Sequence, residues 1–330
     1  MLELAQPPSL TDGMMGKHRT GTFHLPVYFL ATSLLLLTIH CQAGSFLLIE
    51  SSKGEIYNRF KSSLNQFLIK NGNSLTTRNI DSFRPQGGIV GIQKYDAIVS
   101  AGIEASITIS RIDTKTTILM AMVPKESYYE LIHSGDIRCQ VQNCRVLYLD
   151  QPVNRQLKTL KLALPASKRI TAIGSKNSRR LLGEISRSAV GFGLNINVVE
   201  ISDEYSALTA LNNNLANSDL LMAIPDPVVY NRNTARAILL SAFHQHIPLF
   251  AYSRSFVRAG ATIGIYSTPE DIARHVAELL TQKRIITSAQ QNIYPKYYTI
   301  DINQRAAEAL GLALPEVQLL TQKLKAYEKE

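Results

Sequence analysis

Residues 219–282 read DLLMAIPDPVVYNRNTARAILLSAFHQHIPLFAYSRSFVRAGATIGIYSTPEDIARHVAELLTQ. This pattern predicts a buried strand, a loop with Pro225-Asp226-Pro227, a helix, a second buried strand ending at Tyr252-Ser253, a third strand and a further helix. Strands that alternate with helices in this way form a parallel sheet, and ligands bind in the loops at the carboxyl ends of its strands. The segment therefore predicts an α/β fold and one edge of the sheet as the place for a site.

The same alternation runs from residue 44 onward in two series, which meet at Asp150-Gln151-Pro152. Because the expected strands are nearly continuous runs of Val, Ile and Leu, each sheet should be covered by helices on both faces. The sequence therefore predicts two lobes, each with a doubly wound parallel sheet and helices outside. In the first series we expect strands at 45–50, 95–101, 116–123 and 145–149 and a helix at 54–70. In the second we expect helices at 153–164, 178–192 and 206–216, strands at 169–174 and 195–201, and a last strand and helix at 297–302 and 304–310.

The chain has 330 residues and a formal net charge of +9, which would suit an anionic partner. It has no dense run of Lys and Arg and no interleaving of aromatic with basic residues, so the charge is diffuse. This pattern favours a solvated surface, and we expect no nucleic-acid partner.

The amino terminus has the pattern of an export signal. A basic patch at residues 17–19 precedes the apolar run LPVYFLATSLLLLTI at 25–39, and small residues follow in Cys41-Gln42-Ala43. This order predicts a signal peptide over residues 1–43, cleaved after Ala43. The apolar run is short for a membrane span, so an uncleaved anchor is the lesser alternative. Lipidation at Cys41 is another alternative, although Thr38-Ile39-His40 matches a lipoprotein motif poorly.

Export changes the interpretation of the remaining cysteines. Beyond the predicted cleavage site the chain keeps only Cys139 and Cys144. Two cysteines in an oxidising compartment favour a disulfide between them. Free buried thiols are the alternative, and without a nearby His cluster the pair makes a weak metal site.

Catalytic and cofactor motifs are missing from the sequence. It contains no G-x-S-x-G elbow, no phosphate-binding G-x-x-x-x-G-K-[ST] loop and no H-E-x-x-H pair. His244 and His246 lie two residues apart near a helix end, and that spacing does not put two ligands on one helix face. We therefore expect no catalytic residues, no metal and no cofactor.

Polar residues follow several of the predicted strands at the edge where a ligand would bind. A cleft of hydroxyl groups, amides and tyrosines with few acids and bases suits binding better than proton transfer. Asp226 is either a turn residue that accepts hydrogen bonds from amides or a carboxylate that contacts ligand, and we expect Asp226→Ala to weaken binding more than it lowers stability. The candidate ligand-binding residues are Ser51, Ser52, Ser100, Gly102, Asp226, Ser253 and Tyr266.

Four stretches resemble the periplasmic substrate-binding proteins of ABC transporters: IPDPVVYN, IPLFAYS, FVRAGATIGIYSTPEDIARHVAELL and YYTIDINQRAAEALGLALPE. The closest group is the uncharacterised family that includes tryptophan- and tyrosine-type binding components. YLDQP at 148–152 resembles the crossing between lobes in that family. The resemblance covers about 145–315, and it is weaker over 44–144, where Pro124-Lys125-Glu126 replaces an expected Asp-Pro turn.

The resemblance implies a type I periplasmic-binding fold whose two lobes are joined by a three-segment hinge. The first lobe would take residues 44–150 and 268–293, and the second 151–267 and 294–330. The protein would be a periplasmic monomer that binds a small organic molecule between the lobes and delivers it to an ABC permease. The main alternative is a sensory module that docks on a membrane receptor kinase, cyclase or chemoreceptor, and an exported enzyme is a weaker one.

Overall fold

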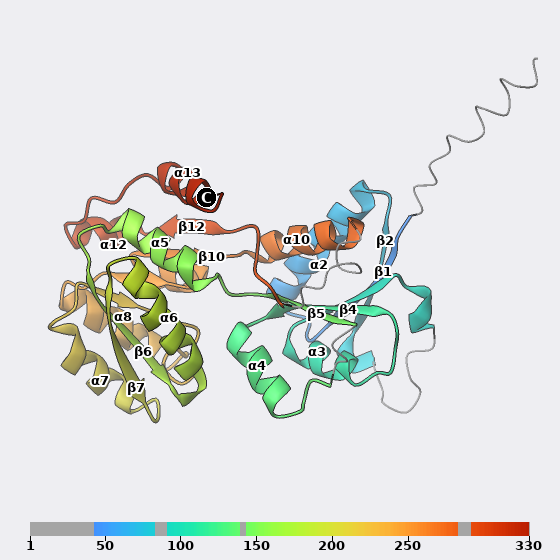
Figure 1. The fold of residues 1–330 in the computed structure, drawn as a ribbon, viewed down its shortest axis with the longest axis horizontal. Helices are drawn as coiled ribbons and strands as arrows, with labels where there is room; N and C mark the ends of the chain where they lie inside the picture. Colours follow the sequence, from blue (N-terminus) through green and yellow to red (C-terminus); the bar gives the residue numbers. More distant parts are fainter. Residues whose placement is uncertain (1–42, 83–90, 139–142, 283–291, 330) are drawn as a thin grey trace, which may run out of the picture. The chain divides into compact units, whose positions relative to one another are not determined.

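The computed structural model describes residues 43–82, 91–138, 143–282 and 292–329, and their strands form two six-stranded sheets (Figure 1). The first sheet has the order β11-β5-β4-β3-β1-β2, and all of its strand pairs are parallel. Its strands are β1 (Ser45–Glu50), β2 (Ser74–Asn79), β3 (Ala97–Ala101), β4 (Thr117–Val123), β5 (Cys144–Tyr148) and β11 (Asn292–Ile293).

The second sheet has the order β12-β10-β9-β8-β6-β7, which repeats the order of the first. Its pairs are parallel except β10 with β12, which are antiparallel, so one edge strand of this otherwise parallel sheet runs in the opposite direction. Its strands are β6 (Arg169–Ser175), β7 (Asn195–Ile201), β8 (Leu220–Met222), β9 (Leu249–Ala251), β10 (Ile263–Tyr266) and β12 (Thr299–Ile302).

Helices bury both faces of the first sheet. Phe60 and Leu64 of α2 (Glu55–Lys70) share an apolar cluster with Ile272 and Val276 of α10 (Pro269–Thr281), and Figure 1 shows the two helices side by side. A separate cluster on the sheet includes Ile109 of α3 (Ile103–Ser110), and the partly buried tyrosines of α4 (Lys125–His133) pack against it. The alternating series therefore forms the doubly wound lobe that the sequence predicts.

One larger apolar cluster forms the core of the second lobe. It includes Leu157 of α5, Ile185 of α6, Leu211 of α7 and Ile238 of α8. Helices α12 and α13 come from the carboxyl-terminal end of the sequence, and Leu320 and Leu324 of α13 belong to the same cluster. The helices of this lobe are α5 (Val153–Ala163), α6 (Arg179–Gly191), α7 (Ser206–Leu215), α8 (Ala235–His244), α9 (Arg254–Ala259), α12 (Gln304–Ala309) and α13 (Val317–Tyr327).

The chain passes between the two sheets three times. The first crossing joins β5 to α5, the second joins β10 to α10, and the third joins β11 to β12. At the second crossing, Thr268 is the N-cap residue of α10 and forms a capping box with Asp271. The cap fixes where the chain leaves the second sheet for the first lobe.

The sequence missed the elements with weak apolar patterns. Strand β2 (SLTTRN) is a polar edge strand, and the helix α9 is short. Helices α3, α4 and α13 were also not predicted. These elements follow from packing against strands and helices that are distant in the sequence, so local periodicity does not reveal them.

Some predictions fall on residues outside the described parts of the chain. The predicted signal peptide, including Cys41, lies outside the described residues except for Ala43. Cys139 also lies outside them. Cys144, at the start of β5, is disulfide-bonded, while its pairing with Cys139 stays a prediction. Across the described residues, no helix has both the length and the apolar character that a membrane span requires.

Candidate functional site

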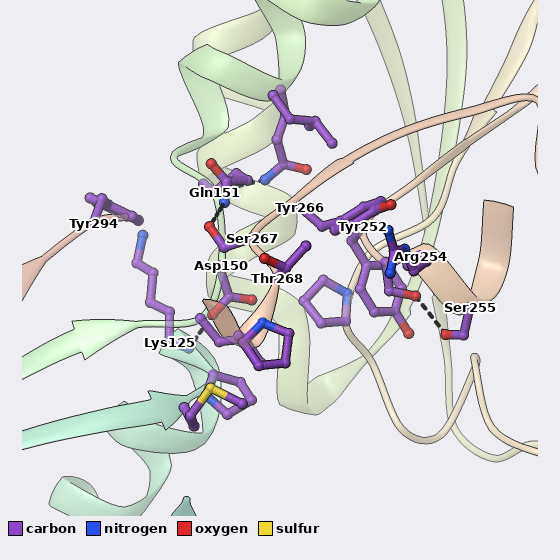
Figure 2. Close-up of a pocket in the computed structure, with 18 of the residues that line it drawn as sticks. Lys125, Asp150, Gln151, Tyr252, Arg254, Ser255, Tyr266, Ser267, Thr268 and Tyr294 are labelled. Carbon is purple, nitrogen blue, oxygen red and sulfur yellow. Dashed lines mark hydrogen bonds between the residues drawn. The ribbon is translucent and has the colours of Figure 1, made fainter. Parts of the chain in front are cut away.

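A cavity of about 420 Å³ lies between the two lobes at the carboxyl ends of their strands (Figure 2). The first lobe contributes residues that follow β4 and β5, and the second contributes residues that follow β8, β9 and β10. A volume of a few hundred cubic ångströms is the usual size of a site for a small organic molecule. The cavity therefore has the position and size of a ligand site.

A distortion at the end of β4 shapes the first-lobe wall. Met122 has a positive φ of 59°, and the pairing of β4 with β5 changes register between Met120 and Val123. A left-handed backbone at a residue other than glycine costs about 1 kcal/mol or more and is often found at ligand sites. The irregularity turns the chain so that Pro124 and Lys125 line the cavity.

Lys125 and Asp150 join the ends of β4 and β5. The Lys125 N–H donates to a carboxylate oxygen of Asp150. Burial raises the pKa of Asp150 above the usual aspartate range, and the backbone N–H groups of Lys125 and Asp150 only partly offset this. Asp150 is therefore a carboxyl group at the cavity whose charge is costly unless a ligand or cation balances it.

Two ion pairs connect the lobes beside the cavity. Lys125 Nζ lies 2.6 Å from Glu184 of α6, and Arg180 of α6 lies 2.6 Å from Glu126. Burial lowers the pKa of Lys125, but hydrogen bonds to Glu184 and Tyr294 outweigh it, so the net shift is upward. Since α4 belongs to the first lobe and α6 to the second, these pairs link the two walls of the site.

The second-lobe wall is aromatic and carries two exposed guanidinium groups, those of Arg254 and Arg258. Figure 2 shows Tyr252, Tyr266 and Arg254 grouped on this wall. Tyr266 donates from its hydroxyl to Asp301 over 2.8 Å, and burial followed by this hydrogen bond raises the pKa of Tyr266 to about 12. Burial, and then Asp226 and Asp150, raise the pKa of Tyr252 to about 12 as well. Both phenols therefore stay neutral and can present hydroxyl groups and ring faces to a ligand.

A chain of hydrogen bonds joins all three crossings at the edge of the cavity, where Gln151 and Ser267 are lining residues. Gln151 Nε2, on the first crossing, donates to Ser267 Oγ on the second over 2.8 Å (Figure 2). Ser267 Oγ donates in turn to the carbonyl of Tyr297 on the third over 2.6 Å. The three segments are therefore coupled, as a hinge between two lobes requires.

Of the residues predicted from the sequence, Ser253 and Tyr266 line the cavity. Ser253 caps α9 by accepting a hydrogen bond from the Phe256 N–H, and its hydroxyl lies 2.9 Å from that of Ser255. The other five predicted residues do not line it, so their contact with a ligand stays a prediction. They are Ser51, Ser52, Ser100, Gly102 and Asp226.

The protein's own side chains fill the crevice between β1 and β3. Ser51 Oγ donates to the carbonyl of Ala101 and accepts from the Ala105 N–H, each over 2.9 Å. A Cβ atom on Gly102 would lie 2.4 Å from the Tyr57 hydroxyl. Ser100 is fully buried and pairs with Ser106, whereas Ser52 is exposed. This strand edge is occupied by internal contacts, which explains why the cavity lies at β4 and β5 instead.

Asp226 is 1% exposed and sits behind the cavity wall, one residue after the lining residue Pro225. Its carboxylate accepts from the backbone N–H groups of Ser175, Val228 and Val229 and from the hydroxyls of Ser175 and Ser178. Burial opposes its ionisation, but the hydrogen bonds from Ser178, Ser175 and Val229 outweigh burial and lower its pKa. In the structure Asp226 holds the ends of β6 and β8 together. Beyond it, Thr234 takes the N-cap position of α8, and the Asn231 side chain accepts hydrogen bonds from the backbone N–H groups of Asn233 and Thr234.

Sequence reasoning did not propose several residues of the cavity as ligand contacts. Lys125, Asp150 and Gln151 had been noted only for the turn and the lobe boundary, although they too follow predicted strands. The same positional signal that selected Ser51 could have selected them. Arg254 carries the same signal, because it directly follows the strand expected to end at Tyr252-Ser253, whereas Tyr294 carries none, because β11 was not predicted.

The cavity offers hydroxyl, aromatic, carboxylate and guanidinium groups. Its described lining contains neither His nor Cys, the residues that most often serve as base or thiol nucleophile. Among the described residues there is also no group of three or more His, Cys, Asp or Glu placed to hold a metal ion. The lining is thus suited to holding a molecule in place.

Residues 55–323 match a family model described as ABC transporter substrate binding protein. The chain belongs to this family. A comparison with curated proteins finds no match.

Solved structures similar to this family member have the type I periplasmic-binding fold. One is the ligand-free, open form of a substrate-binding protein with adhesive properties from Clostridium difficile, with a TM-score of 0.65, 16% identity and coverage of 83% of this chain and 97% of that one. A conserved domain protein from Vibrio cholerae has a TM-score of 0.56 and 18% identity, with coverage of 84% of this chain and 98% of that one. An ABC domain from Streptococcus pneumoniae in complex with L-Trp has a TM-score of 0.55 and 13% identity, with coverage of 83% of this chain and 96% of that one. At identities this low, the structural similarity establishes the shared fold alone. It confirms the predicted two-lobed architecture.

Proposed function

We propose that this family member is an exported solute-binding protein that captures a small organic molecule between its lobes and delivers it to an ABC permease. The observation that carries the proposal is the cavity itself. It is walled by the carboxyl ends of strands from both sheets and backed by the coupled crossings at Gln151, Ser267 and Tyr297. A ligand that touches both walls would favour the closed arrangement of the lobes.

The lining supports a ligand with an apolar or aromatic body. Tyr252, Tyr266 and Tyr294 supply ring faces, while Asp150 and Arg254 supply opposite charges. Since the pneumococcal structure contains L-Trp, aromatic amino acids are the first molecules to test on this chain.

Export, the permease and the monomeric state belong to the same proposal. The basic, apolar and small-residue order at 17–43 supports export into the periplasm. The family supports a permease as the receiving protein. Stimulation of ATP hydrolysis by a reconstituted ABC permease would test delivery, and light scattering would test the monomer.

A thermal-shift screen of the purified exported protein against small metabolites tests ligand capture. A ligand at about 100 times its dissociation constant should add about 2.7 kcal/mol to the free energy of unfolding. If no amino acid, sugar or other small metabolite shifts the unfolding transition, the proposal is refuted.

Two variants locate the site once a ligand is found. Tyr252→Ala should weaken binding about tenfold or more, since it removes a ring from the wall. Tyr205→Ala is the matched control, because Tyr205 lies on the same lobe and is 87% exposed. Arg254→Ala should also weaken ligand binding, while the free energy of unfolding stays unchanged, because Arg254 is an exposed lining residue. Equal affinities in all three variants would place binding elsewhere.

A further inference from the structure

A second hollow lies on the second lobe between helices α8, α9 and α12, with a volume of about 1070 Å³. On α8, Leu240 and Phe243 line it while remaining 46% and 40% exposed. Ala306 and Ala309 of α12 line it as well. The charged residues of its described lining are all arginines, so we call this hollow the basic groove.

Four exposed arginines line the basic groove: Arg232, Arg236, Arg258 and Arg305. Among the residues that the structure describes, its lining contains no Asp, Glu or Lys. None of the ion pairs among the described residues involves these four arginines. Elsewhere on the protein ion-paired arginines are common, namely Arg59, Arg111, Arg155, Arg169, Arg179, Arg180 and Arg274.

This combination fits a protein partner with carboxylate groups. The planar guanidinium group binds a carboxylate through two parallel hydrogen bonds, and arginine, unlike lysine, is enriched at protein interfaces. Exposed Leu240 and Phe243 offer an apolar floor for one large side chain. We propose that the basic groove is a docking surface for an acidic segment of a partner protein, anchored by an aromatic or leucine side chain.

The basic groove is continuous with the ligand cavity. Tyr252, Ser253, Ser255 and Arg258 line both. A docked segment would therefore lie against the α9 wall of the cavity and contact residues that a bound ligand also contacts. That the partner is the protein which receives the ligand rests on the proposed function, whereas docking of an acidic segment does not.

The hollow form favours a peptide segment over an anionic bilayer. Its arginines and apolar side chains converge on one concave space between three helices, which a chain segment can enter. A membrane surface would instead favour basic residues spread over a convex or flat face. Binding to anionic lipid is therefore the outcome that would replace the proposal.

The test is a selection of random peptides displayed on phage against the purified exported protein. Enriched peptides should combine Asp or Glu with Phe, Trp or Leu. A fluorescent copy of one selected peptide should then bind at least about tenfold more weakly to the double variant Arg236→Glu with Arg305→Glu, since charge pairs become repulsive. Phe243→Ser should weaken it as well. Arg187→Glu is the matched control, because Arg187 is exposed on α6 of the same lobe outside the groove.

Each result decides the matter. Enrichment of acidic peptides that bind the Arg187→Glu protein but not the double variant supports docking. No enrichment, selection of peptides without acidic residues, or equal binding to the double variant overturns it. Binding of phosphatidylglycerol vesicles through the same arginines, without peptide binding, also overturns it. Thermal shifts by small metabolites are measured on the same proteins, so failure of ligand capture is seen separately from failure of docking.

Discussion

Replacing Asp226 by Ala should lower the stability of the second lobe more than it lowers ligand affinity. This expectation reverses the one drawn from the sequence, because the structure places the carboxylate behind the cavity wall with five hydrogen-bond donors around it. Truncation removes the acceptor for all five. The hydroxyls of Ser175 and Ser178 can turn toward other acceptors, but three backbone N–H groups cannot.

The magnitude follows from those three amides, which belong to Ser175, Val228 and Val229. A buried donor left without a partner costs about 1–3 kcal/mol. Two of the three hydrogen bonds are buried and one is partly buried, so we expect a loss of about 3–5 kcal/mol in the free energy of unfolding. For a chain of this size that is a drop of roughly 4–8 °C in Tm.

Chemical and thermal unfolding measure the loss, and ligand titration of the folded variant measures affinity. Asp203→Ala is the matched control, since Asp203 is an exposed carboxylate on the same lobe that accepts from the Ser206 N–H over 3.0 Å. Loss of such a local cap costs only about 1 kcal/mol. Both variants should keep ligand affinity within about threefold, because neither removed side chain lines the cavity.

The pH dependence gives a second measure of the same contact. The folded protein lowers the pKa of Asp226, so its carboxylate stabilises the fold fully above the unfolded value of about 3.9. That contribution is lost as the pH falls through the lower folded pKa. The stability difference between the parent and Asp226→Ala should therefore be largest near neutral pH and shrink in acid. An unchanged Tm together with a large loss of affinity would refute this account and favour direct ligand contact.

Two further predictions concern the movable link between the lobes and the filled strand edge. Glu184→Gln should weaken ligand binding by up to about fivefold in titrations, because it removes an interlobe ion pair worth up to about 1 kcal/mol. Unchanged affinity would show that the pair does not favour closure. Gly102→Ala should destabilise the protein by more than 1 kcal/mol in denaturant unfolding, since φ is 93° and the new Cβ would lie 2.4 Å from the Tyr57 hydroxyl. Combining Gly102→Ala with Tyr57→Phe removes the hydroxyl contact but keeps the backbone cost, so an undiminished loss relative to Tyr57→Phe alone would contradict a steric role for the Tyr57 hydroxyl.

Local pattern was sufficient for the elements that carry strong apolar periodicity. Strand β1 and strand β7 have the predicted bounds, and helix α2 begins one residue after the predicted start. Their signals are runs of apolar residues at a spacing that only one secondary structure satisfies. The polar strand β2 and the short helix α9 lacked such a signal and were missed.

The sequence by itself determined that this protein alternates strands with helices in two series and therefore forms two α/β lobes. It also determined the edge of each sheet where a ligand would bind, because the carboxyl ends of parallel strands share one edge. Only the tertiary structure decided which of those ends face the cavity. Tyr57 fills the edge near Gly102, whereas the irregular end of β4 turns Lys125 toward Asp150. The reason is that a residue's place on a strand is local, while the space in front of it depends on side chains from distant segments.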